Sequence, residues 1–220
     1  MMASPRILSV DPHDPDPRVI REVVQVVQAE GLVALPTDTL YGLGADIFSG
    51  AAVQRILMLK ARPHDKPIPI FISSIAALEE IARGVPEAAK RLAQQFWPGP
   101  LTLILHASPE IPENITAGTG TVGVRIPNLP LIQAILAPLK RPLTGTSANR
   151  SGGINPVIAA DVLKALGTQL DLLVDGGKTS GGVASTVLDC TQFPFRVIRD
   201  GAIERGAIAA LLGENHPISL

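Results

Sequence analysis

The stretch LVALPTDTLYGLG, residues 32–44, decides how the whole sequence is interpreted. Its first four residues are apolar, which is typical of a short buried strand. The nine residues that follow carry two threonines, an aspartate, a tyrosine and two glycines. Small hydroxyl and glycine positions directly after a strand indicate a loop where the backbone can approach a ligand closely.

Helical and strand-like patterns alternate on both sides of this stretch. Asp16 and Pro17 are suited to begin a helix that Gly31 ends, and Ser49 is suited to cap a helix that runs to Lys60. Pro69 makes the apolar run at 68–72 an edge strand or an irregular one. Further helices are expected at 75–83, 86–96, 131–137, 158–166 and 204–212, and further strands at 101–106, 121–126, 170–175, 186–190 and 195–200. A strand that runs into a loop is expected at 142–149. We therefore predict an α/β fold with an open, twisted mixed sheet, flanked by helices and presenting a concave ligand-binding face.

The composition indicates one globular domain, since 46% of the 220 residues are hydrophobic and 18% are charged. We expect an extended N-terminal segment at 1–17, a single domain at 18–213 and a short tail at 214–220. One Trp, one Tyr and five Phe are too few for a surface that stacks nucleic-acid bases. With a net charge of -1, any contact with a polyanion must come from a local cluster of Lys and Arg.

Several classes of site and location are disfavoured. The single cysteine, Cys190, lies in an apolar run and is expected to be a buried, unreactive thiol. His13, His64, His106 and His216 lack the spacing of metal ligands, so no protein-built metal site is predicted. No stretch reaches the length of a membrane span, and the opening ten residues do not resemble a signal peptide. A cytoplasmic protein without membrane contact is expected.

Two kinds of motif suggest a binding pocket. Three predicted strands end in hydroxyl-bearing loops, PTDT, TGTSAN and GGVAST, and ligands of open α/β sheets gather at such ends. The segment KARPHDKP places three cations within seven residues, which is either a solvated helix end or a clamp on phosphate oxygens. Arg125 and Arg199 lie in predicted strands, where a substrate carboxylate could pair with a guanidinium. Together these features suit a small amino-acid-like ligand beside a nucleoside triphosphate.

The sequence resembles the YrdC-like threonylcarbamoyl-AMP synthases, in their short, single-domain form. The resemblance rests on PTDTLYGLG, KARPHDKP, WPGPLT, TVGVRIP, TSAN, DGG and VASTVLD, which occur in the family's order over roughly residues 20–205. It implies an enzyme that joins L-threonine, bicarbonate and ATP into threonylcarbamoyl-AMP and pyrophosphate, with Mg²⁺ accompanying ATP. It also implies a downstream threonylcarbamoyl-transferase complex that modifies tRNA, and possible contact with tRNA itself.

The resemblance also implies roles for individual residues. Thr39, Arg125 and Ser185 would bind L-threonine, with Arg125 taking its carboxylate. Lys60 and Arg62 would be catalytic. The residues expected to hold ATP are Arg62, Lys66, Thr121, Ser147, Asn149, Asn155 and Arg199, with Asn149 shaping the TSAN loop. The sequence departs from the family at Phe71, where a histidine is frequent, and at Asp38, where many members have glutamate.

Two other functions remain open at this point. The same cations could grip the backbone of a double-stranded RNA or a tRNA, whose shape can be recognised without aromatic residues. The chain could also be another carbamoyl-adenylate-forming enzyme, since YrdC-like domains occur in larger carbamoyltransferases.

Overall fold

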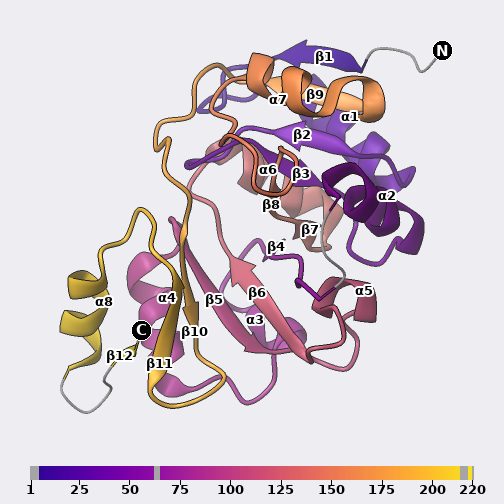
Figure 1. Cartoon of the computed structure of the whole chain (residues 1–220). Helices are drawn as coiled ribbons and strands as arrows, with labels where there is room; N and C mark the ends of the chain where they lie inside the picture. Colours follow the sequence, from indigo (N-terminus) through magenta and orange to yellow (C-terminus); the bar gives the residue numbers. More distant parts are fainter. Residues whose placement is uncertain (1–4, 62–64, 214–217, 220) are drawn as a thin grey trace.

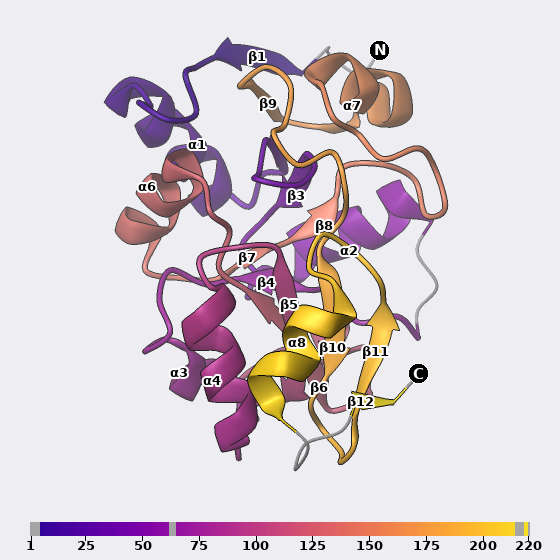
Figure 2. The same ribbon diagram turned by 90° about the vertical axis from the view of Figure 1, so that its left-hand side faces the viewer.

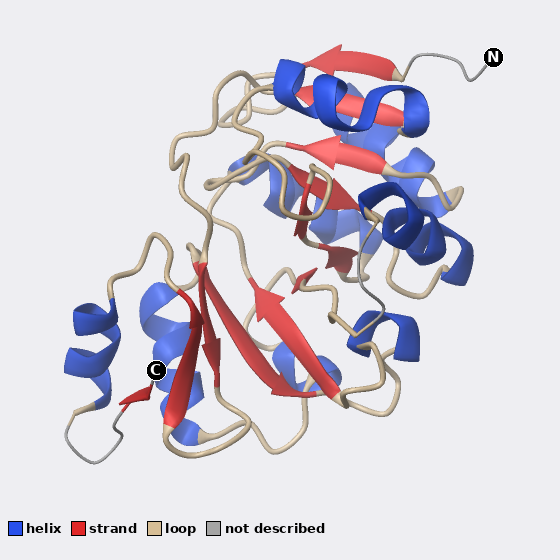
Figure 3. Cartoon of the chain, viewed as in Figure 1, coloured by secondary structure: helices blue, strands red, loops and turns tan. Residues whose placement is uncertain are grey.

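The computed structural model describes residues 5–61, 65–213 and 218–219. Its strands form two open mixed sheets, which lie one above the other in Figure 1, with helices packed against them (Figures 1 and 3). This arrangement confirms the predicted α/β fold with mixed pairing and flanking helices. The strands are, however, divided between two sheets, and the segment at 142–149, predicted as a strand running into a loop, passes from one sheet to the other.

The upper sheet has the strand order β1-β9-β2-β3-β8. Its first three strands run parallel, while β3 is antiparallel to both β2 and β8. The strands are β1 (Arg6–Ser9), β2 (Val33–Leu35), β3 (Gly42–Gly44), β8 (Thr146–Ser147) and β9 (Leu172–Asp175). The segment at 1–17, predicted to be extended, thus contributes an edge strand at Arg6–Ser9.

The lower sheet has the order β12-β11-β10-β5-β6-β4-β7 and alternates parallel with antiparallel pairs. Its strands are β4 (Ile70–Phe71), β5 (Leu101–His106), β6 (Thr121–Arg125), β7 (Leu143–Thr144), β10 (Thr186–Asp189), β11 (Phe195–Arg199) and β12 (Ile218–Ser219). Pro69 was predicted to make β4 an edge strand or an irregular one; β4 is not at an edge, since it lies between β6 and β7, and it pairs over two residues only. Pro69 precedes the two paired residues and so removes no ladder hydrogen bond.

The helices are divided between the two sheets, as Figures 1 and 2 show from two sides. Those around the upper sheet are α1 (Pro17–Gln28), α2 (Gly50–Lys60), α6 (Pro130–Leu139) and α7 (Ala159–Leu166), followed by the short 3-10 helix η1 (Gly167–Gln169). Those around the lower sheet are α3 (Leu78–Ile81), α4 (Glu87–Phe96), α5 (Glu113–Thr116) and α8 (Arg205–Leu212).

Both faces of the upper sheet are covered, which explains why its strand β2 is apolar at every position. Val33 and Leu35 join a core cluster with α1 and α6. Ala34, between them, points to the other face and joins the larger cluster that includes α2 and α7. A strand buried on both faces has no polar side to alternate with.

The lower sheet has one helix-covered face and one face that bears polar residues. In β5, Leu101, Leu103 and Leu105 are buried in the core together with α4. Thr102 and Ile104 alternate with them and therefore point to the opposite face. This second face of the lower sheet is turned toward the upper sheet and forms the wall of a cavity.

Most local signals predicted the elements correctly. The Asp16 carboxylate accepts a hydrogen bond from the backbone N–H of Arg18 with Pro17 at the first helical position, and the Ser49 hydroxyl accepts from Ala52. Helix α1 ends before Gly31, because Glu30 adopts the left-handed conformation with φ of 61°. The stretch predicted as one loop after β2 contains strand β3, which pairs back on β2 as a hairpin.

Candidate functional site

A cavity of about 560 Å³ lies between the two sheets. The upper sheet contributes the PTDT loop after β2, and the lower sheet contributes strands β4, β5, β6, β10 and β11. The chain crosses from one sheet to the other at Gly145, the single residue between β7 and β8. Gly145 is held there, since its N–H donates to the carbonyl of Pro69 at 2.6 Å.

One row of residues across the lower sheet forms the floor of this cavity. The registers pair Phe71 with Arg125, Thr102 with Val187 and Val187 with Arg199. Extending the β5–β6 register by one residue brings Thr102 opposite Arg125. Residues paired in this way point to the same face of a sheet, and all five line the cavity.

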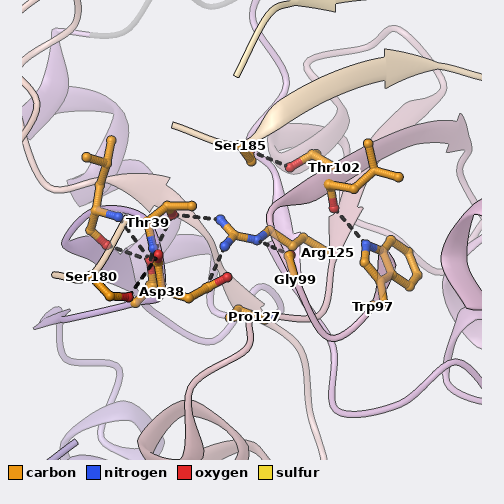
Figure 4. A network of polar contacts seen from close by, with 12 residues as sticks. Asp38, Thr39, Trp97, Gly99, Thr102, Arg125, Pro127, Ser180 and Ser185 are labelled. Atoms are coloured by element: carbon orange, nitrogen blue, oxygen red, sulfur yellow. Dashed lines mark hydrogen bonds and ion pairs between the residues drawn. The ribbon is translucent and has the colours of Figure 1, made fainter. Parts of the chain in front are cut away.

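Arg125 is buried and oriented by three hydrogen bonds, which Figure 4 draws together with its neighbours. Its Nε donates to the carbonyl of Gly99 at 2.9 Å, and its terminal nitrogens donate to Thr39 Oγ1 at 2.9 Å and Asp38 Oδ1 at 2.5 Å. Burial lowers the pKa of Arg125, while the Asp38 carboxylate raises it. Asp38 therefore compensates a guanidinium that the fold holds away from bulk water.

A second arginine, Arg199 on β11, also lines the cavity. The guanidinium of Arg199 donates to the carbonyl of Ser185 at 2.8 and 3.1 Å and to Ser185 Oγ at 3.1 Å. Ser185 Oγ lies 2.9 Å from Thr102 Oγ1 (Figure 4). Arg199 is also close enough to lower the pKa of Arg125 by charge repulsion. Two cations facing one cavity favour an anionic ligand.

The PTDT loop is fixed by its own hydroxyl groups. Thr37 Oγ1 accepts from the backbone N–H groups of Thr39 and Leu40 at 3.1 and 3.2 Å, and it donates to the carbonyl of Leu40 at 2.7 Å. Such a turn presents Thr39 Oγ1 to Arg125. Thr37 and Thr39 therefore belong to the hydrogen-bonded turn and also line the cavity.

The glycine-rich loop after β9 packs on the PTDT loop. The buried hydroxyl of Tyr41 donates to the carbonyl of Gly177 at 2.7 Å and accepts from the N–H of Gly176 at 3.2 Å. Gly182 donates to the carbonyl of Thr39 at 3.0 Å. At Gly181 a Cβ atom would lie 2.5 Å from the carbonyl oxygen of Asp38, so the absence of a side chain permits this contact.

The ammonium group of Lys60 bonds the backbone of the TSAN loop. Its Nζ is buried and donates to the carbonyls of Ser147 and Asn149 at 2.5 and 2.7 Å. The Asn149 amide nitrogen donates to the carbonyls of Gly153 and Ile154 at 3.0 and 2.9 Å. Neither Lys60 nor Asn149 is among the described residues that line the cavity.

The structure brings most of the predicted site residues together. Those that line the cavity are Thr39, Arg125 and Ser185 from the predicted threonine site, and Lys66, Thr121, Ser147, Asn155 and Arg199 from the predicted nucleotide site. Lys60, predicted to be catalytic, directs its ammonium at the loop backbone, and its catalytic role stays a prediction. Asn149 likewise shapes the loop. Arg62, predicted to be catalytic, lies outside the described residues.

Three residues of the site were absent from the sequence-based set. Phe71, noted only as a departure, lies 5.9 Å from the Arg125 guanidinium and contributes a cation–π contact. Asp38 compensates Arg125, and Thr102 bonds Ser185. The alternation in LTLILH could have marked Thr102 as facing away from the core, but its partner on another strand required the sheet register.

Two further observations concern metal ligands and membrane-spanning helices, neither of which the sequence predicted. Across the described ranges, no three His, Cys, Asp or Glu side chains gather so that they could hold a metal ion, and His64 and His216 lie outside those ranges. Within the same ranges, every helix is too short or too polar to traverse a lipid bilayer.

Comparison with known proteins gives close relatives. The chain is 40% identical over 195 residues to a threonylcarbamoyl-AMP synthase of Pyrococcus abyssi and 39% identical over 202 residues to one of Bacillus subtilis. These matches cover 89% and 91% of this chain but 57% and 58% of the two relatives. The chain thus spans less than two thirds of the length of these two relatives.

A solved structure of P. abyssi Sua5 in complex with L-threonine has the same fold. It superposes with a TM-score of 0.92 at 38% identity, over 97% of this chain and 62% of the other. The model of the Sua5_yciO_yrdC family, described as telomere recombination, matches residues 25–201. Since that match extends over most of the chain, the protein belongs to the Sua5/YciO/YrdC family.

Proposed function

We propose that this protein is an L-threonylcarbamoyladenylate synthase, which converts L-threonine, bicarbonate and ATP into threonylcarbamoyl-AMP and pyrophosphate. The observation that carries the proposal is the buried guanidinium of Arg125, oriented at the floor of a cavity that a second arginine also faces. Family membership and the names of the relatives support the same activity.

Arg125 is suited to bind the carboxylate of the amino acid. A guanidinium has five N–H groups, and three of these donate to Gly99, Thr39 and Asp38. Within the described residues the other two have no protein acceptor, so they can donate to the two oxygens of one carboxylate. Thr39 Oγ1 lies beside that position and can contact the polar groups of the same ligand.

The remaining lining residues are suited to a nucleotide. Lys66 and Arg199 supply positive charge, and Thr121, Ser147 and Asn155 supply hydroxyl and amide groups. The described lining residues include no carboxylate, so a Mg²⁺ ion would be held by phosphate oxygens and water, which the polar lining can accommodate. When bound, the ion neutralises charge on the phosphates.

Catalysis by this site would consist mainly of positioning. The reacting groups, a carbamate and the phosphates of ATP, are all anions, so they must be brought together against their mutual repulsion. Fixed cations and hydroxyl donors in a partly dry cavity reduce that repulsion. Holding two reactants in line can by itself lower a barrier by ~7–11 kcal/mol in favourable cases.

The product would be passed to a threonylcarbamoyl-transferase complex that modifies adenosine in tRNA, which would place the protein in the cytoplasm. The transferase partners and a direct contact with tRNA belong to the proposal. A downstream transferase is supported by the reactive mixed anhydride of the product, which requires an acceptor.

Pyrophosphate release from ATP and Mg²⁺ tests the proposal. Release should require both bicarbonate and L-threonine, and serine, valine or no amino acid should support much less. Arg125→Ala should abolish the threonine-dependent release, while Arg196→Ala, at an exposed arginine of β11, should retain it. Release without threonine, or neither release nor ATP binding, would refute the synthase activity, and the second result would favour RNA binding.

A further inference from the structure

The hydroxyls of Thr102 and Ser185 form a pair on the floor of the cavity, and Ser185 also accepts a hydrogen bond from Arg199. We infer that this pair binds the one-carbon oxyanion of the reaction, first bicarbonate and then the carbamate, and that Thr102 is therefore a substrate-binding residue. The inference rests on the proposed synthase activity and assigns a subsite within it.

The pair lies between the two arginines on the cavity floor. Thr102 on β5 neighbours Arg125 on β6, and Val187 on β10 separates it from Arg199 on β11. Gly123 lies beside it, where a Cβ atom would come within 3.4 Å of the Thr102 methyl group. The missing side chain at Gly123 keeps this part of the floor open to the cavity.

The hydrogen bonds of the pair leave one of its two hydroxyl hydrogens available to a ligand. Ser185 Oγ accepts from the Arg199 guanidinium at 3.1 Å and lies 2.9 Å from Thr102 Oγ1. Each hydroxyl has one hydrogen, and one of the two hydrogens is used between them. We assign the shared hydrogen to Ser185 Oγ, so that the Thr102 hydroxyl keeps an O–H that can donate to a ligand in the cavity.

The charge of Arg199 makes this remaining donor suited to an anion. A hydroxyl that accepts from a cation is polarised and becomes a stronger donor, and chains of hydrogen bonds transmit that effect. Hydrogen bonds to ionised acceptors are roughly twice as strong as neutral ones. The pair is therefore better matched to an oxyanion than to an ammonium group or to the neutral hydroxyl of threonine.

The distance from Arg125 fits a group attached to the amino acid's nitrogen. Thr102 lies on the strand next to that of Arg125, with about 4.8 Å between the two backbones. In an α-amino acid only one carbon separates the carboxylate from the amine. A carbamate on that nitrogen is therefore short enough to lie between Arg125 and a neighbouring group, and the subsite assigned here places it on the β5 side.

The subsite fits both steps of the chemistry. The amine nitrogen forms a bond to the carbon of bicarbonate, and one oxygen leaves as water with the proton of bicarbonate and one amine proton. A carbamate oxygen then forms a bond to the α-phosphorus of ATP, and the bond to the β-phosphate breaks to release pyrophosphate. A donor at the one-carbon group orients both the electrophile of the first step and the nucleophile of the second.

The experiment measures the KM for bicarbonate by pyrophosphate release at saturating L-threonine and ATP. Thr102→Val keeps the shape of the β-branched side chain but removes the hydroxyl, and Thr102→Ser keeps the hydroxyl. We expect Thr102→Val to raise the KM for bicarbonate roughly 10- to 100-fold, the range for one hydrogen bond to an anion. The KM for bicarbonate of Thr102→Ser should remain within about threefold of the wild-type value. In both variants the KM values for threonine and ATP should remain within about twofold.

An unchanged KM for bicarbonate in Thr102→Val would overturn the inference, as would a rise confined to the KM for threonine. Ser185→Ala provides a second variant should Thr102→Val not fold. It interrupts the chain of hydrogen bonds from Arg199 to Thr102, so the KM for bicarbonate should rise, while the KM for threonine can also change because Ser185 is predicted to bind that substrate. Absence of release from the wild-type protein would instead refute the synthase activity itself. The failure of the subsite is thereby distinguished from the failure of the proposed function.

Discussion

Arg125→Lys tests the three-way anchoring of the guanidinium. Arginine presents its donors in a fixed planar fork, whereas lysine is a point charge on a flexible chain. The lysine ammonium can still pair with Asp38, but it cannot also serve the carbonyl of Gly99 and the hydroxyl of Thr39 from one position. The variant therefore keeps its charge and loses two buried hydrogen bonds.

The expected cost follows from those two bonds. Each is a charge-assisted bond worth about 1.5 kcal/mol, so the free energy of unfolding should fall by about 3 kcal/mol. For a chain of this size that corresponds to a decrease in Tm of about 6–12 °C. Urea unfolding should show a lower midpoint with an unchanged slope, and the KM for L-threonine should rise because the planar pair of free donors is gone.

The matched control is Arg196→Lys on β11, an exposed position. The same exchange at the surface should alter the free energy of unfolding by less than about 0.5 kcal/mol. Equal small effects for the two variants would refute the reasoning, since they would mean that the buried contacts of Arg125 add nothing to stability.

Three further predictions concern other parts of the molecule. Burial raises the pKa of Tyr41 to about 12, above its unfolded value of about 10, so its contribution to stability is complete below pH 10. Above that pH the unfolded chain binds fewer protons, and the free energy of unfolding should fall by up to ~1.4 kcal/mol per pH unit until about pH 12. Tyr41→Phe should lack this component, and identical slopes in urea titrations of the two proteins would contradict it. Gly145→Ala would place a Cβ atom 2.5 to 2.8 Å from the ring of Phe71 and should cost about 1–3 kcal/mol. Adding Phe71→Leu should restore part of that loss, and no recovery in the double variant would show that the clash is elsewhere. Cys190 is buried, and burial raises the pKa of its thiol, so a thiol reagent should label it only as the protein unfolds; prompt labelling of the native protein would disprove this.

The sequence predicted the parts of the fold and site that depend on local chemistry. The apolar run of β2, the caps at Asp16 and Ser49, and the hydroxyl loops follow from residues close together in the chain. The hairpin strand β3 was missed, because Gly42–Gly44 has little strand propensity of its own and is held by pairing with β2 and β8.

The direction of a side chain was harder to predict than its presence. Lys60 lies in a basic segment that suggests phosphate binding, yet its ammonium is turned to the backbone of the TSAN loop. Thr102 lies in an ordinary strand pattern, and its importance comes from Ser185, 83 positions away in the sequence. Such assignments depend on the registers between distant strands, which one sequence does not encode in any local pattern.

The row of paired residues on the lower sheet also sets the distance between the backbones of its two arginines. Arg125 and Arg199 are separated by three strand intervals, β6 to β5, β5 to β10 and β10 to β11. At about 4.8 Å each, these intervals set their backbones roughly 14 Å apart. This length is fixed by backbone hydrogen bonding and not by loops. Changes in the surrounding loops could alter which groups are recognised at either end, while the separation of the two arginine backbones would stay the same.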